Sequence, residues 1–77
     1  MNEKNLRIIV TGGSGFIGTN FVDLMIEKGV KFLNLDIEEP RKKQHKEFWE
    51  QLDILDKESF ERKIQQFQPT HICHLAA

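Results

Sequence analysis

A glycine-rich segment near the start of the chain has the spacing of a phosphate-binding turn. Residues 11–18 read TGGSGFIG, directly after a short apolar run. In such a turn we expect Gly12 to permit the tight bend and Gly15 to let the backbone approach a pyrophosphate. Gly18, one turn further on, would allow a helix to pack closely against the preceding strand. The chemistry that this pattern predicts is the binding of a pyrophosphate group.

The residues around the third glycine could complete an anion site. The backbone amides of Phe16 and Ile17 would face the phosphates from the positive end of the following helix. Ser14 could add a hydroxyl donor. The Phe16 side chain has two open interpretations, as part of the core or as a wall of the ligand site. The alternative for the whole segment is a glycine turn without a ligand, whereas the absence of a Gly-Lys-Ser/Thr sequence excludes a Walker-type loop.

An acidic residue follows the glycine segment at the distance that a dinucleotide site requires. Asp36 ends the second apolar run, 18 residues after Gly18 and near the expected spacing of about 20. Its carboxylate would accept hydrogen bonds from the ribose hydroxyls and repel a 2′-phosphate, which favours NAD over NADP as the cofactor. The alternative is an ordinary aspartate in a turn. Arg41, Lys42 and Lys43 could in principle serve a 2′-phosphate, but Glu38 and Glu39 lie beside them and Asp36 would oppose the phosphate, so we interpret them as a solvated loop.

The elements that must position these residues alternate in the order of an α/β fold. We expect a first helix that ends near Gly29 and a second that begins at Asp56 as its N-cap, with Leu55 and Phe60 packed as a hydrophobic staple. The polar residues 37–47 predict a surface loop. Four apolar runs predict buried strands, at residues 6–10, 30–35, 48–52 and 70–76. Together they predict the N-terminal half of a Rossmann-type parallel sheet with strand order 3-2-1-4.

Composition narrows the classes of protein further. The 77 residues carry a formal net charge of -1, which offers no basic field for nucleic acid or for a membrane surface. The single cysteine, Cys73, excludes an internal disulfide, and with the absence of a signal peptide or membrane span it favours the cytoplasm. His71 and Cys73 would share one face of a strand while His74 points to the other, so we expect no metal site.

Four segments together closely resemble the extended branch of the short-chain dehydrogenase/reductase superfamily, nearest to its NAD-dependent nucleotide-sugar epimerases and dehydratases. They are TGGSGFIG, Asp36, the pair Asp53-Ile54 and the ending His74-Leu75-Ala76-Ala77. The resemblance implies that Asp53 accepts a hydrogen bond from the adenine amine, with Ile54 against the ring. It also implies that the backbone and small side chains of Leu75, Ala76 and Ala77 pass under the cofactor.

The same resemblance implies a function for the parent protein. A nucleotide-activated sugar would lose a hydride to tightly held NAD, and the keto intermediate would then be epimerised or dehydrated. In the family the catalytic Ser or Thr and the Tyr-x-x-x-Lys lie further along the sequence, and this chain has no tyrosine. We therefore expect residues 1–77 to be the N-terminal part of a NAD-binding domain, without catalytic residues and from a homo-oligomer. The alternatives are a reductase of a non-sugar carbonyl and a non-catalytic NAD-binding sensor.

Overall fold

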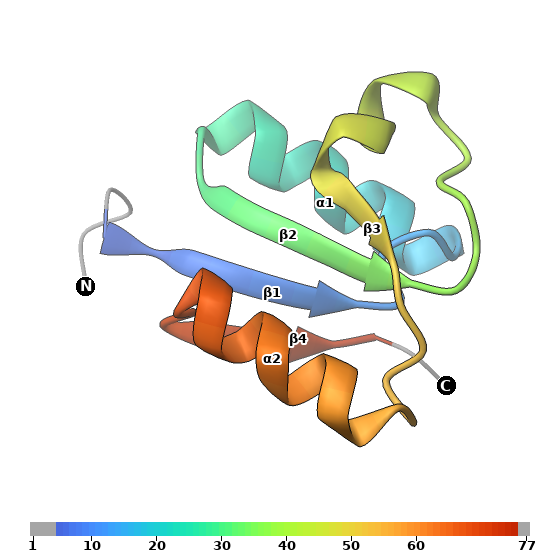
Figure 1. Cartoon of the computed structure of the whole chain (residues 1–77). Helices are drawn as coiled ribbons and strands as arrows, with labels where there is room; N and C mark the ends of the chain where they lie inside the picture. The colour runs from blue at the N-terminus through green and yellow to red at the C-terminus, as the bar shows by residue number, and fades with distance from the viewer. Residues whose placement is uncertain (1–4, 76–77) are drawn as a thin grey trace.

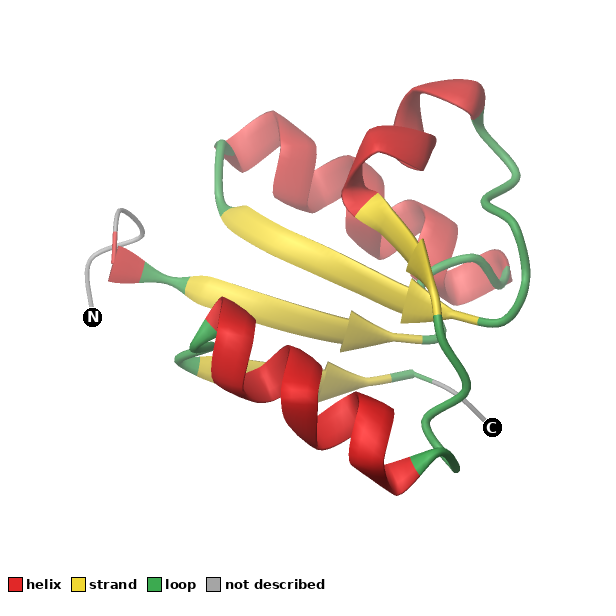
Figure 2. Ribbon diagram, in the orientation of Figure 1, coloured by secondary structure: helices red, strands yellow, loops and turns green. Residues whose placement is uncertain are grey.

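The computed structural model describes residues 5–75, in which four parallel strands form one sheet (Figures 1 and 2). The strands lie in the order β3-β2-β1-β4, which confirms the predicted order and the Rossmann-type α/β class. Their bounds are β1 Arg7–Thr11, β2 Lys31–Asp36, β3 Trp49–Gln51 and β4 His71–His74.

The sheet is buried most deeply at β1, its central strand. Ile9 and Val10 have no exposed surface, as expected of an apolar strand covered on both faces. Register places Ile8 opposite Phe32 on one side and opposite His71 on the other. The polar ends of all four strands therefore collect at one edge, where β1 and β2 deliver the glycine segment and Asp36.

Two helices cover opposite faces of the sheet (Figure 2). Helix α1, Phe16–Lys28, packs Val22 and Met25 against the face that carries Ile8, Val10 and Phe32. It ends at Gly29, whose φ of 68° is the left-handed conformation that a C-terminal cap requires.

Helix α2, Lys57–Phe67, lies on the other face and has no fully buried residue. Arg7 of β1 fixes its C-terminal end, because the guanidinium lies 4.7 Å from the ring centre of Phe67 and donates to the Phe67 carbonyl. None of the helices among residues 5–75 is long and apolar enough to cross a bilayer.

Three expectations about local structure are wrong. The polar segment 37–47 is not loop throughout, because a 3-10 helix, η2, occupies Lys43–Phe48 and buries His45. Phe48 belongs to η2 and stacks on Phe32 at 4.8 Å between ring centres, so it does not begin β3. The staple is also absent: the Asp53 carboxylate accepts from the amide of Leu55, and the resulting turn leaves the Leu55 side chain 87% exposed.

Candidate dinucleotide-binding site

The glycine segment makes a tight turn between β1 and α1 at the C-terminal edge of the sheet. Gly12 has a φ of 79°, a left-handed conformation that side chains other than glycine rarely adopt, and its amide donates to the Leu35 carbonyl at 3.1 Å. A Cβ on Gly18 would lie 2.3 Å from the Gly12 carbonyl oxygen. At Gly15 the nearest atom to such a Cβ is 3.7 Å away. The turn is thus closed beneath Gly18 and open above Gly15.

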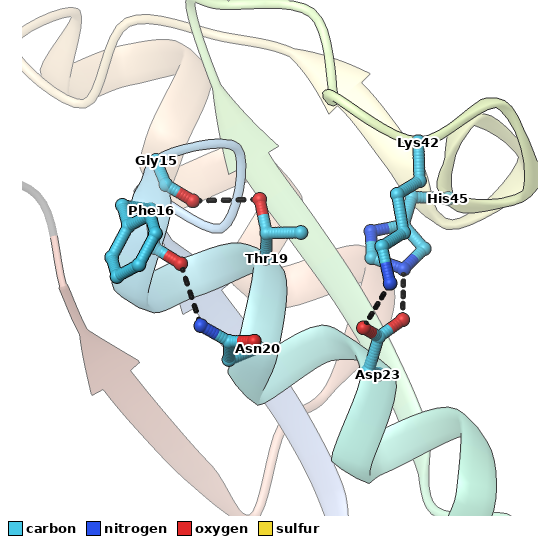
Figure 3. Close-up of polar contacts among 7 residues, drawn as sticks. All are labelled: Gly15, Phe16, Thr19, Asn20, Asp23, Lys42 and His45. Carbon is cyan, nitrogen blue, oxygen red and sulfur yellow. Dashed lines mark hydrogen bonds and ion pairs between the residues drawn. The ribbon is translucent and has the colours of Figure 1, made fainter.

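The N-terminus of α1 offers unpaired backbone donors. Gly15 is the N-cap, no side chain caps the helix, and its first turn contains no acidic residue. The carbonyl of Gly15 accepts from the Thr19 amide and from the Thr19 hydroxyl (Figure 3), so the amides of Phe16 and Ile17 precede the first helical hydrogen bond. Their side chains are 71% and 70% exposed, which rules out the interpretation of Phe16 as a core residue.

Asn34 supports the turn from below, and the sequence analysis missed it. Its side chain is 1% exposed and accepts from the Gly13 amide at 2.9 Å, while its Nδ2 donates to the Ser14 hydroxyl at 3.2 Å. A Cβ on Gly13 would lie 2.5 Å from the Asn34 side chain. The available signal was a lone amide within an otherwise apolar buried strand, where a polar group needs a partner.

Asp36 connects the end of β2 to the glycine turn. One carboxylate oxygen accepts from the Ser14 amide at 2.9 Å, and the other accepts from the Glu38 amide at 2.9 Å. Asp36 therefore does make the turn that the alternative interpretation expects, through the Glu38 amide. The same carboxylate also holds the glycine segment, through the Ser14 amide. Carboxylate oxygens accept more than one hydrogen bond each, so these two contacts leave acceptor sites for a ligand.

Asp36 stands between two hollows of the surface. The first, of about 270 Å³, is called here the Asp53 hollow and is lined by Gly12, Leu35, Asp36, Ile37, Leu52, Asp53, Ile54 and Leu55. Two hydrogen bonds to the Asp36 carbonyl draw the end of β3 against β2, one from the Trp49 indole at 3.0 Å and one from the Leu52 amide at 3.2 Å. The structure thereby brings Asp36, Asp53 and Ile54 together around one largely apolar space.

The second hollow, of about 640 Å³, is called here the Arg41 hollow. It is lined by Gly12, Ser14, Gly15, Asp36, Ile37, Glu38, Glu39, Arg41 and Leu75. Leu75 reaches it because its amide donates to the Thr11 carbonyl at 2.8 Å, which holds the end of β4 beside β1. Ala76 and Ala77 lie outside the described residues. Phe16 and Ile17 line neither hollow, so any direct contact of theirs with a ligand there rests on their amides.

The histidines have structural partners. His74 Nδ1 lies 2.6 Å from the Thr11 hydroxyl, and His45 Nε2 lies 2.7 Å from an Asp23 oxygen (Figure 3). Lys42 contacts the other Asp23 oxygen, and hydrogen bonds from Lys42 first and His45 second lower the pKa of Asp23. This cluster ties η2 to α1. Within residues 5–75, no three side chains of the metal-binding types gather at one place.

Comparisons with known proteins agree with this geometry. The profile of the NAD dependent epimerase/dehydratase family matches residues 8–77. A probable dTDP-glucose 4,6-dehydratase of Sinorhizobium fredii is 31% identical over 81 residues, covering 94% of this chain and 23% of that protein.

Two solved structures have the same fold over 94% of the chain. The UDP-glucose 4-epimerase of Thermus thermophilus, in complex with NAD, is 37% identical with a TM-score of 0.80. The dTDP-glucose 4,6-dehydratase of Bacillus anthracis, also in complex with NAD, is 29% identical with a TM-score of 0.83. The chain spans 24% and 27% of these two proteins, about a quarter of their length.

Proposed function

Because the chain belongs to the NAD-dependent epimerase/dehydratase family, we propose that it forms the N-terminal part of the NAD-binding domain of an enzyme that acts on a nucleotide-activated sugar. The cofactor of the family is NAD. The substrate class is proposed from the similar proteins, which include a UDP-glucose epimerase and a dTDP-glucose dehydratase.

The residues present fit a dinucleotide at three points. A Cβ on Gly15 would make only an ordinary van der Waals contact, 3.7 Å from the Gly12 carbonyl oxygen, which leaves room for a phosphate above it. The uncapped end of α1 supplies amides that favour an anion. Asp36 presents a carboxylate between the two hollows, where a ribose would lie between its base and its phosphate. The observation that carries the proposal is this convergence of Gly12, Asp36 and Asp53, from separate segments, around one space.

Each part of the chain would then have its own task. The backbone of Gly12 and Gly15 and the amides of Phe16 and Ile17 would hold the pyrophosphate. Three further groups would complete the site, with Asp36 on the ribose hydroxyls, Asp53 and Ile54 at the adenine, and Leu75, Ala76 and Ala77 beneath the remainder of the cofactor.

When bound, NAD supplies the hydride acceptor, and the protein supplies binding and orientation. We propose that this half of the site contributes orientation alone. The groups that would move protons on the sugar lie outside residues 1–77, which contain no tyrosine. The chain by itself is accordingly expected to turn over no nucleotide sugar.

The proposal is tested on the full-length protein. NAD content is measured after purification, and UDP- and dTDP-hexoses are then assayed for conversion with NAD, with NADP and without added cofactor. We expect bound NAD and conversion of a nucleotide sugar that depends on it. Failure to bind NAD would contradict the proposal. Bound NAD without conversion of any nucleotide sugar would instead favour the reductase of another carbonyl or the non-catalytic sensor.

A further inference from the structure

We propose that Arg41 is a cofactor-binding residue whose guanidinium contacts the pyrophosphate of NAD, an inference that rests on the function proposed above. Arg41 lies in the segment between β2 and η2 and lines the Arg41 hollow together with Ser14 and Gly15. Its guanidinium carbon is 5.9 Å from the centre of the Phe16 ring. Since Phe16 is the first residue of α1, this contact holds the cation beside the uncapped helix end.

The other charged residues around the Arg41 hollow would repel an anion, and the Arg41 guanidinium would offset that repulsion. Every other charged residue that lines the hollow is acidic, namely Asp36, Glu38 and Glu39. A pyrophosphate placed there needs positive charge, and the helix end supplies only a partial one. A guanidinium supplies a full charge and a planar set of N–H donors that match phosphate oxygens.

Arg41 is also available to bind. Glu39, its nearest acidic neighbour in sequence, is paired with Lys46 at 2.6 Å. Among residues 5–75 Arg41 takes part in none of the ion pairs. The exposed face of Phe16 is its one aromatic partner. A cation held by an aromatic ring loses less freedom on binding than a free surface arginine.

The position favours the pyrophosphate over the other parts of a dinucleotide. Arg41 does not line the Asp53 hollow, where the adenine is proposed to lie. A 2′-phosphate on the ribose would lie against the Asp36 carboxylate and be repelled by it. The neighbouring Lys42 is engaged by Asp23. Lys43, the first residue of η2, lines neither hollow, and it therefore provides a control with the same charge close by in the sequence.

The test is calorimetric titration of the full-length protein and its Arg41→Gln, Arg41→Lys and Lys43→Gln variants with NAD, NADP, ADP and adenosine. We expect Arg41→Gln to weaken NAD and ADP about tenfold, the scale of one charge-assisted hydrogen bond. Adenosine binding should not change, and Arg41→Lys should fall between Arg41→Gln and the wild type. Lys43→Gln should change NAD affinity by less than about twofold, since exposed charges at a distance are screened.

Each other result has a definite meaning. Equal losses of NAD affinity in Arg41→Gln and Lys43→Gln would show a general charge effect and overturn the inference. Equal loss of adenosine affinity would show altered structure, and a loss confined to NADP would place Arg41 at the 2′-phosphate; either overturns it. Unchanged NAD binding in Arg41→Gln overturns the inference alone, whereas a wild type that binds no NAD overturns the proposed function as well.

Discussion

The two helices of this molecule begin in opposite ways. At α2 the Asp56 side chain accepts from the Ser59 amide at 3.3 Å and from the Ser59 hydroxyl at 2.7 Å, and Glu58 adds negative charge to the first turn. At α1 the N-cap is Gly15, which has no side chain to offer, and the first turn is uncharged. One helix satisfies its own positive end, and the other leaves that end exposed at the C-terminal edge of the sheet.

The difference between the two helix starts distinguishes a helix end that serves local stability from one that is open to a ligand. A capped helix start stabilises a helix by itself, and α2 needs that help because none of its residues is fully buried. Helix α1 buries Val22 and Met25 and is anchored by the contact between Gly18 and the turn. It can therefore forgo a cap, and the helix end without one is the end that the proposed ligand would reach.

The largest expected effect comes from closing the turn beneath α1. In Gly18→Ala the new Cβ would lie 2.3 Å from the Gly12 carbonyl oxygen, so the turn must move and detectable NAD binding should be lost. Such overpacking also costs about 1–3 kcal/mol of stability. Calorimetric titration and urea unfolding measure the two effects. Gly29→Ala is the control for binding: its methyl group meets no atom within 4 Å but its φ of 68° is strained for alanine, so it should lower stability and leave NAD affinity unchanged.

Removing the Asp36 carboxylate should change the choice of cofactor. We expect Asp36→Ala to weaken NAD about tenfold through the lost charged hydrogen bonds and to leave NADP unchanged or improved, because the repulsion of a 2′-phosphate is gone. Parallel titrations with both nucleotides measure the ratio. Asp36→Asn keeps an acceptor for the Ser14 amide and isolates the charge. Equal losses for both nucleotides would mean that Asp36 only shapes the turn.

A smaller effect is expected at Asn34, which is proposed to position the turn without touching the ligand. Asn34→Ala leaves the buried Gly13 amide without its acceptor, at a cost of about 1–3 kcal/mol. The binding affinities for NAD and for NADP should both fall several-fold. Asn20→Ala is the matched control, because Asn20 is exposed and its side-chain amide donates to the Phe16 carbonyl of its own helix. An unchanged affinity in Asn34→Ala, with stability lowered, would limit Asn34 to a structural role.

The smallest effect is expected at Asp56, the N-cap of α2. Asp56→Ala should lower the melting temperature by a few degrees and leave NAD affinity unchanged. Hydrogen bonds from the Ser59 side chain and then its amide lower the pKa of Asp56 from its ordinary value of 3.8. A depressed carboxyl pKa stabilises the folded protein above that ordinary value, and this contribution is lost as the pH falls through the folded pKa. The difference between Asp56→Ala and wild type should therefore be full above about pH 4 and shrink as the pH falls through the folded pKa, which lies below 3.8, as followed by thermal melts.

The fold could be predicted from the sequence because the local signals agreed with the rules of sheet topology. Buried apolar runs, a glycine turn and capped helices predict parallel strands, and right-handed crossovers limit their order. The 3-10 helix η2 was not predicted, because all of its residues except Phe48 are polar. It is stabilised by partners distant in sequence, with His45 bound to Asp23 and Phe48 stacked on Phe32.

The residues of the candidate site likewise fall into those that the sequence could predict and those that it could not. Gly12, Gly18 and Asp36 could be chosen from spacing, because their roles depend on backbone geometry that recurs at fixed intervals. Asn34 and Arg41 could not, because their significance depends on what lies beside them in space. Asn34 matters through Gly13 on the neighbouring loop, and Arg41 through Phe16 on a helix far from it in sequence.

The pairing of β4 with β1 has a consequence for how the chain folds. The Arg7 amide donates to the Thr70 hydroxyl across a sequence separation of 63 residues, so β1 gains its second neighbour only after the segments that carry β2, β3 and α2 have been made. Long loop closures slow folding. We expect β1, α1 and β2 to assemble first and β4 to dock last. In native-state hydrogen exchange, β4 should open at a lower free energy than β2, and a synthesising ribosome would leave one side of β1 unpaired until residue 70 emerges.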